Sequence, residues 1–172
     1  GQETLRRIDS RLVEELRAQG ELVEGFKIRA GRRMLASMRS GTIIGTTRAR
    51  LTGILLAAVQ QDRRITLSTG HRLEAIDLAS RTLQFTGTTT VEVGNGLVIA
   101  CDGVWSKTRQ SMAEQLADFV PEVSDWGVQF RVLFSAPGAM APGLDPNWHH
   151  IFTGKGIYTA TLPDGVWCVA VT

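Results

Sequence analysis

Apolar residues at helical spacing mark two segments in the first third of the chain. The first set lines one face of a helix that would end near Gly20, because glycine readily adopts the backbone conformation that closes a last turn. The second set follows Thr46 and Thr47, either of which can cap a helix N-terminus. The pattern therefore predicts two amphipathic helices. The apolar positions are Leu5, Ile8, Leu12, Val13 and Leu16 in the first, and Leu51, Ile54, Leu55, Ala58 and Val59 in the second.

Arg48 lies in the first turn of the second predicted helix. A cation is unfavourable there, because the N-terminal end of the helix dipole is positive and favours anions. A bound phosphate would explain this arginine, since guanidinium and phosphate groups form strong charge-assisted hydrogen bonds. An exposed arginine without a ligand is the structural alternative, and the residues alone leave both interpretations open.

Short runs of β-forming residues occupy positions 64–101, and the last of them, residues 97–101, is apolar throughout. Such a run is typical of a strand buried on both faces. Asp102 and Gly103 follow it, and glycine allows a sharp turn or the close approach of a ligand. Ser106 stands where an N-cap is expected for a helix that carries Arg109. We therefore expect a carboxylate and a guanidinium at a strand-to-helix junction, where open α/β sheets bind ligands. The apolar positions of this helix are Met112, Leu116 and Phe119.

Strand-like runs dominate the chain after Pro121. Residues 136–147 read APGAMAPGLDPN and are expected to form an exposed loop, because they are rich in proline and glycine. A boundary between residues 120 and 124 would separate an α/β part from a β-rich part. We predict an α/β (α+β) fold with domains at residues 1–122 and 123–172. The strand candidates are residues 126–135, 148–153, 156–162 and 165–172.

The patterns around the histidines and aromatic residues indicate structural roles more readily than metal binding or catalysis. His149 and His150 are adjacent and point to opposite faces of a strand, which argues against a joint metal site. His71 is predicted to be a surface strand residue. No metal-ligand cluster and no Ser-His-Asp set stand out. The aromatic residues expected in the hydrophobic core are Trp126, Phe130, Phe134 and Trp167.

Composition narrows the class of protein. The 172 residues are 43% hydrophobic and 21% charged, which is ordinary for a globular chain. The net charge of +2 is too small to indicate a nucleic-acid partner, and no apolar run reaches the roughly 20 residues of a membrane helix. We therefore expect a cytoplasmic protein without nucleic-acid or membrane partners. Cys101 and Cys168 lie in apolar runs and are predicted to be small buried hydrophobes, not disulfide partners or zinc ligands.

Four segments, in this order, carry a resemblance to a known enzyme family. Residues 46–59 (TTRARLTGILLAAV) resemble the family's helix beside the flavin, and residues 71–76 (HRLEAI) resemble the strand that follows it. Residues 97–109 (LVIACDGVWSKTR) are similar to its Asp-Gly motif. Residues 145–172 resemble its substrate-domain strands, with a motif formed by Pro146, Asn147, Trp148 and His150. The family is the single-component FAD-dependent aromatic monooxygenases, which includes the para-hydroxybenzoate and kynurenine hydroxylases.

This resemblance implies hydroxylation of a small aromatic substrate with NAD(P)H and dioxygen, through a flavin hydroperoxide. It implies a partial FAD-binding Rossmann-like domain and a β-rich substrate domain. Arg48 would contact the phosphate or ribityl part of FAD, and Leu73 would lie near its adenosine half. Among Arg29, Arg32 and Arg33, the resemblance points to Arg33 as the residue for a substrate carboxylate. The implied cofactor-binding residues are Arg48, Leu73, Asp102, Gly103 and Arg109, and the implied substrate-binding residues are Arg33 and His150.

Departures from the family pattern qualify these expectations. The chain has no GxGxxG segment after an initial strand and no later Gly-Asp motif, so the loops that would hold the pyrophosphate and the ribityl chain are missing. We expect an internal piece of a longer protein that alone neither binds FAD tightly nor turns over. The spacing from Arg33 to Arg48 is shorter than in the family and leaves no tyrosine there. Kynurenine is therefore not the expected substrate.

Other interpretations share the same residues. A flavin-dependent halogenase or an isoprenoid reductase would show a similar Asp-Gly region, and a small-ligand binding module without redox chemistry would need only the β-rich part. Asp102 could simply cap the turn that follows it. Arg109 could stack on Trp105, which lies four residues earlier on the helical spacing.

Overall fold

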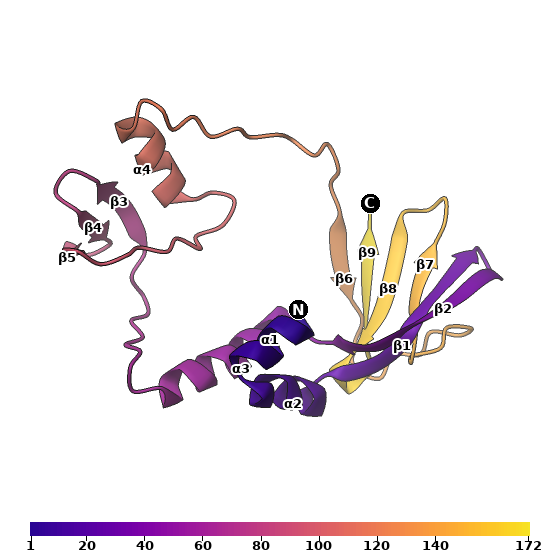
Figure 1. The fold of residues 1–172 in the computed structure, drawn as a ribbon. Coiled ribbons are helices and arrows are strands. Elements are labelled where there is room, and N and C mark those ends of the chain that lie inside the picture. Colours follow the sequence, from indigo (N-terminus) through magenta and orange to yellow (C-terminus); the bar gives the residue numbers. More distant parts are fainter. The chain divides into compact units, whose positions relative to one another are not determined.

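Two β-sheets, four α-helices and a short 3-10 helix (Pro163–Gly165) make up the regular structure, and a computed structural model describes all 172 residues (Figure 1). Residues 1–66 and 127–172 form one compact unit, and residues 67–126 form the other. The first unit thus takes its elements from both ends of the chain. Each unit has a sheet of its own, so the protein is mixed α/β. The predicted domain boundary at residues 122/123 stays a prediction.

Six strands form the sheet of the first unit, in the order β2, β1, β7, β8, β9, β6 (Figure 1). β1 and β7 are parallel and all other neighbours are antiparallel, so the sheet is mixed. The three strand candidates after residue 147 are confirmed, whereas only the end of the candidate at 126–135 forms a strand. The bounds are β1 (Glu21–Ala30), β2 (Arg33–Gly45), β6 (Arg131–Phe134), β7 (His149–Phe152), β8 (Ile157–Leu162) and β9 (Val166–Val171).

The hairpin of β1 and β2 is not among the predicted elements. It contains the basic stretch from residue 27 to 39, and residues 33–42 of β2 are exposed, so no alternation of apolar and polar positions marks the strand. Gly25 is needed where the two strands approach closely. A Cβ atom at this position would lie 2.1 Å from the carbonyl oxygen of Met38. The hairpin therefore depends on backbone pairing and on one glycine, which a hydrophobic pattern does not reveal.

Asp9 divides the first predicted helix into α1 (Gln2–Ile8) and α2 (Ser10–Gln19). Its backbone is extended, with φ −158° and ψ 119°, and its carboxylate accepts a hydrogen bond from the Arg11 amide. Aspartate favours this N-cap position over a helix interior, because its side chain competes for backbone amides. The prediction of one continuous helix was therefore wrong, although α2 ends as expected at Gly20.

The helix α3 (Arg48–Gln61) is confirmed, and Thr47 is its cap. The Thr47 hydroxyl accepts a hydrogen bond from the Arg50 amide at 3.1 Å. α3 packs against α2 through Leu12, Leu16 and Ile54, which form a buried cluster. Burial of these side chains removes apolar surface from water and holds the two helices together.

In the second unit a three-stranded antiparallel sheet lies beside α4 (Lys107–Gln115) (Figure 1). Ser111 is buried, and its hydroxyl accepts a hydrogen bond from the Ile76 amide at 3.3 Å. The Gln115 carboxamide oxygen accepts another from the Leu78 amide at 2.9 Å. Polar side chains therefore attach the helix to the sheet edge. The strands are β3 (Leu73–Asp77), β4 (Thr82–Phe85) and β5 (Thr89–Glu92).

Residues 97–101 are not a strand, which corrects the prediction of a strand buried on both faces. Leu97 and Ile99 are 87% and 78% exposed, and Cys101 is exposed instead of buried. An apolar run becomes a buried strand only where neighbouring strands pair with it. In the second unit β3, β4 and β5 pair with one another and none pairs with this run.

Other predicted packing also differs. α4 ends at Gln115, because Leu116 has an extended backbone, so Phe119 lies outside the helix. His71 is exposed but precedes β3. Of the four aromatic residues expected in the core, only Trp167 is buried, because its neighbours β8 and the 136–147 loop cover it. Trp126, Phe130 and Phe134 are exposed. No helix of the chain is long and apolar enough to cross a bilayer.

The packing of α2 on α3 predicts that Leu16 and Ile8 contribute unequally to the free energy of unfolding. Leu16 is buried in the cluster, whereas Ile8 in α1 is 71% exposed. Leu16→Ala should lower the free energy of unfolding by about 2–5 kcal/mol, because it leaves a cavity as well as removing apolar contacts. Ile8→Ala should change it by less than about 0.5 kcal/mol. Urea unfolding followed by circular dichroism measures both, and equal losses would contradict this packing.

Candidate functional site

One face of the six-stranded sheet carries a cluster of buried polar side chains around His150. Register places Lys27 beside His150 and Arg29 beside Phe152 in the parallel pair of β1 and β7, so all of these residues share that face. His150 is fully buried. Titratable groups buried this deeply need hydrogen-bond partners on the polar atoms of their side chains.

Both ring nitrogens of His150 have such partners. The Arg29 Nε donates to His150 Nδ1 at 3.1 Å, so Nδ1 carries no proton. Nε2 lies 2.9 Å from the carbonyl oxygen and 3.1 Å from the amide nitrogen of Asp145. Because Nδ1 accepts from Arg29, the neutral ring carries its proton on Nε2, which donates to the carbonyl. Burial lowers the pKa of His150, and the nearby charges of Arg29 and Lys27 lower it further. The ring is therefore a neutral connector between β1 and the 136–147 loop.

Side-chain contacts hold the 136–147 loop on this face, although much of the loop is exposed as predicted. The Lys27 ammonium forms an ion pair with the Asp145 carboxylate at 2.6 Å, which lowers the pKa of Asp145. Arg29 donates to the carbonyl of Gly143 at 2.9 Å. The Trp167 indole donates to the carbonyl of Ala139 at 3.1 Å. Together with the His150 bond, these contacts hold the loop along most of its length.

His149 lies on the opposite face of β7, as predicted. Its ring meets Phe26 and Tyr158 edge-on, with centroid distances of 5.5 Å and 5.3 Å. The Tyr158 hydroxyl is hydrogen-bonded to His149 Nδ1, and Nε2 is buried without a partner. Burial lowers the pKa of His149 and raises that of Tyr158. No group of three or more His, Cys, Asp or Glu residues could hold a metal ion.

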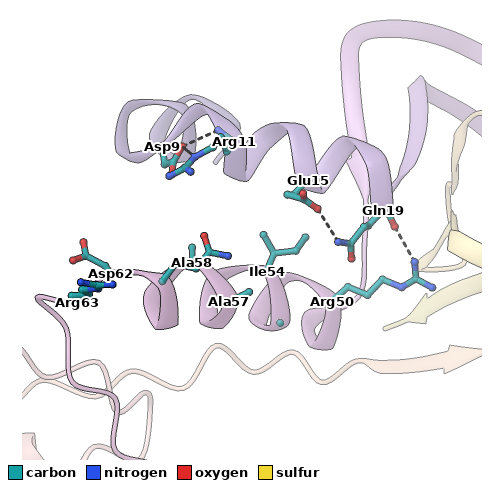
Figure 2. Close-up of a pocket in the computed structure, with 12 residues that line it drawn as sticks. Asp9, Arg11, Glu15, Gln19, Arg50, Ile54, Ala57, Ala58, Asp62 and Arg63 are labelled. Carbon is teal, nitrogen blue, oxygen red and sulfur yellow. Dashed lines mark hydrogen bonds and ion pairs between the residues drawn. The ribbon is translucent and has the colours of Figure 1, made fainter.

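A hollow of about 870 Å³ lies between α2 and α3 (Figure 2). Ile54, Ala57 and Ala58 form its apolar side on α3. Its polar side chains are largely bonded to one another: Asp9 pairs with Arg11, and Gln19 donates to Glu15. Arg50, which also lines the hollow, is paired with Asp164.

Arg48, the predicted phosphate contact, is the first residue of α3 and is exposed. Arg50, in the same helical turn, forms an ion pair with Asp164 at 2.6 Å and donates to the carbonyl of Gln19 at 3.0 Å. No carboxylate lies in this first turn. The two arginines therefore differ: Arg50 connects elements of the first unit, and the guanidinium of Arg48 faces solvent.

The other predicted cofactor residues belong to the second unit. The Asp102 carboxylate accepts hydrogen bonds from the Ser106 hydroxyl at 2.7 Å and from the Thr108 amide at 3.0 Å. These bonds lower the pKa of Asp102 to about 2. Gly103 has a positive φ of 79°, as its predicted turn requires, and Ser106 caps α4 as predicted. Asp102 therefore shapes the turn that starts α4.

Arg109 and Leu73 take different places in this unit. The Arg109 guanidinium donates to the carbonyl of Val104, which closes the same turn from its other side. Trp105, its predicted stacking partner, is 90% exposed. Leu73 begins β3, opposite Phe85 on β4.

The two predicted substrate-binding residues, Arg33 and His150, also lie in different environments. Arg33 is exposed at the start of β2, where it pairs across the hairpin with Ala30. His150 contacts Arg29, one of the two arginines that the sequence ranked below Arg33. Lys27 and Asp145 were missed, because 118 residues separate them and no local motif links them.

Comparison of the sequence with models of protein families finds no match, and a search of curated proteins finds none either.

The two buried histidines predict that acid destabilises the protein. Their pKa values are lowered in the folded state, whereas an unfolded histidine titrates near about pH 6.5. The unfolded chain therefore binds more protons below that pH, and the free energy of unfolding should fall as the pH is lowered from about 7 to 5. Urea unfolding at a series of pH values measures this. His149→Phe should weaken the dependence, and stability that stays flat over this range would refute the assignment.

The contacts of Asp102 predict a local effect on α4. Asp102→Ala removes the acceptor of the Thr108 amide, so hydrogen exchange at Thr108 and Arg109 should become severalfold faster. NMR-detected exchange measures it residue by residue. The matched control is Asp118→Ala, which changes an exposed aspartate beyond the helix and should not alter these amides. Unchanged protection at Thr108 in the Asp102 variant would show that the carboxylate does not order the turn.

Proposed function

We propose that this chain is part of an FAD-dependent monooxygenase that hydroxylates a small aromatic ring with NAD(P)H and dioxygen. The proposal is supported by the order of the four sequence segments that resemble this enzyme class. When bound, FAD would supply the redox chemistry of hydride acceptance and dioxygen activation. The protein's own residues would bind the cofactor, orient the ring and exclude water.

The exposed position of Arg48 at the start of α3 is the structural observation that carries the proposal. Its guanidinium is exposed at the first position of α3 with no carboxylate in that turn, while Arg50 beside it is already ion-paired. The amides of Arg48 and Ala49 also have no partner within the helix, because the first amides of any helix lack one. A cation and free amides at the positive end of a helix suit a phosphate group. This donor set fits the phosphate of FAD.

Asp102 and Arg109 would act by holding the shape of their turn. Asp102 binds Ser106 and Thr108, and Arg109 binds the carbonyl of Val104, so both side chains hold the segment around Gly103. Gly103 has no neighbouring atom within 4 Å of the position of a Cβ, so its backbone is open to a ligand. In the proposed enzyme the dinucleotide would lie against this turn, and Leu73 would contribute an apolar contact.

His150 has a positioning role in the proposed enzyme. Its two nitrogens are bonded to Arg29 and Asp145, so it cannot also accept a proton from a substrate without losing one of these contacts. It would keep the 136–147 loop in place beside the substrate. Arg33, exposed on β2, stays the candidate for a carboxylate group on a substrate.

Replacement of Arg48 tests the proposal. In the native gene product, Arg48→Gln should weaken FAD binding about tenfold, because it removes a charge-assisted hydrogen bond to phosphate. Arg63→Gln removes the same charge from an exposed position just beyond the other end of α3 and should leave FAD binding unchanged. Fluorescence titration of the apoprotein with FAD gives both affinities. Equal affinity of the Arg48 variant and the wild type would remove Arg48 from the cofactor site.

A further inference from the structure

β6 forms one edge of the six-stranded sheet and pairs only with β9 (Figure 1). The Ser135 amide, just past the end of the strand, donates to a carbonyl of β9 at 2.9 Å. Because backbone groups alternate in direction along a paired strand, those of Arg131 and Leu133 also point toward β9. The amides and carbonyls of Val132 and Phe134 therefore point away from the sheet, on the side where no strand lies.

The side chains of β6 are exposed, and both faces of the strand carry apolar residues. Val132 and Phe134 share one face and are 42% and 62% exposed, and Leu133 lies on the other face at 56%. Arg131 is the one charged residue of the strand. A strand edge with unpaired backbone groups and apolar side chains is a template for pairing with another strand.

The opposite edge of the sheet, β2, has features that hinder such pairing. Its exposed part contains Arg33 and Arg39, and its register with β1 shifts at two places. The Gln2 side chain also donates to the carbonyl of Thr42 at 3.0 Å. Charges, irregular register and covered backbone groups keep edge strands from pairing, whereas β6 has a single charge and a regular register. β6 is therefore the edge of this sheet that is open to another strand.

We propose that β6 pairs antiparallel with β6 of a second copy of this chain, about a two-fold axis at Leu133. In this register Val132 of each copy lies opposite Phe134 of the other, and their outward amides and carbonyls form hydrogen bonds between the copies. A β-branched residue opposite an aromatic one is a favourable cross-strand pair. On the other face Leu133 meets its own counterpart. Arg131 lies opposite Ser135, so no like charges face each other.

A second copy matches this edge in both backbone and side chains. The partner must be an extended strand with unpaired amides and carbonyls at alternate positions and with apolar side chains on both faces, and β6 itself has these properties. A two-fold contact uses the same surface on both chains and closes without further growth. Because β6 has only four residues, the contact is small and the dimer should be weak, with a dissociation constant of about 100 µM.

Sedimentation equilibrium of the 172-residue chain, from about 5 to 500 µM, tests the proposal. We expect the average mass to rise with concentration from that of one chain toward that of two. Leu133→Lys should keep the chain monomeric, because it places two ammonium groups face to face at the axis. The matched control is Leu35→Lys on β2, where leucine is 52% exposed, and it should dimerise as the wild type does.

Circular dichroism verifies that both variants fold, which is expected because both leucines are exposed. A wild-type chain that stays monomeric throughout this range would overturn the proposal, even if the β6 edge then bound an extended peptide of another protein. A dimer that persists in the Leu133 variant would place the contact elsewhere and overturn it too. The contact involves no flavin, so these results do not depend on the proposed function.

Disulfide trapping tests the register of the two strands. In a Cys101→Ser background, which removes the exposed native thiol, Leu133→Cys should form a disulfide-linked dimer on mild oxidation. The two cysteines would face each other at a non-hydrogen-bonded position, where the Cα atoms lie within disulfide distance. Arg131→Cys lies on the same face but opposite Ser135 and should cross-link severalfold less. Equal cross-linking of the two variants would contradict an axis at Leu133.

Discussion

The hydrogen bond between Arg29 and His150 is the contact on which the architecture of the first unit depends. It joins β1 to β7 across 121 residues of sequence, at the one parallel pairing in the six-stranded sheet. Burial of an imidazole is less costly when its nitrogens are bonded, and Arg29 and the Asp145 carbonyl satisfy both nitrogens of His150. The ring therefore ties the hairpin of β1 and β2 to the strands from the end of the chain.

The hydrogen-bond network around His150 also fixes which segment covers this face of the sheet. The 136–147 loop is held over β7, β8 and β9 by an ion pair with Lys27 and by hydrogen bonds from Arg29 and His150. Most of the side chains between this loop and the strands are apolar, among them Leu144, Phe152 and Val169. The polar contacts of this face therefore join the loop to the sheet.

Local patterns predicted the elements whose cause is local. Thr47 and Ser106 each cap a helix as expected, and the alternating runs after residue 147 are β7, β8 and β9. Where an element or contact depends on residues far away in the sequence, the prediction was wrong or there was none. The apolar run at 97–101 lacks neighbouring strands and stays exposed, and the pair of Lys27 and Asp145 joins distant segments that share no motif. Sequence could single out His150, but not that Arg29 would be its partner.

The proposed function makes a phosphate group of FAD the partner of Arg48, and an absorbance spectrum of the native gene product, purified without added cofactor, tests it most directly. We predict flavin bands that NADPH bleaches slowly under air and faster when a small aromatic effector is added. A colourless protein that takes up no added FAD would contradict the account and favour a binding module without redox chemistry.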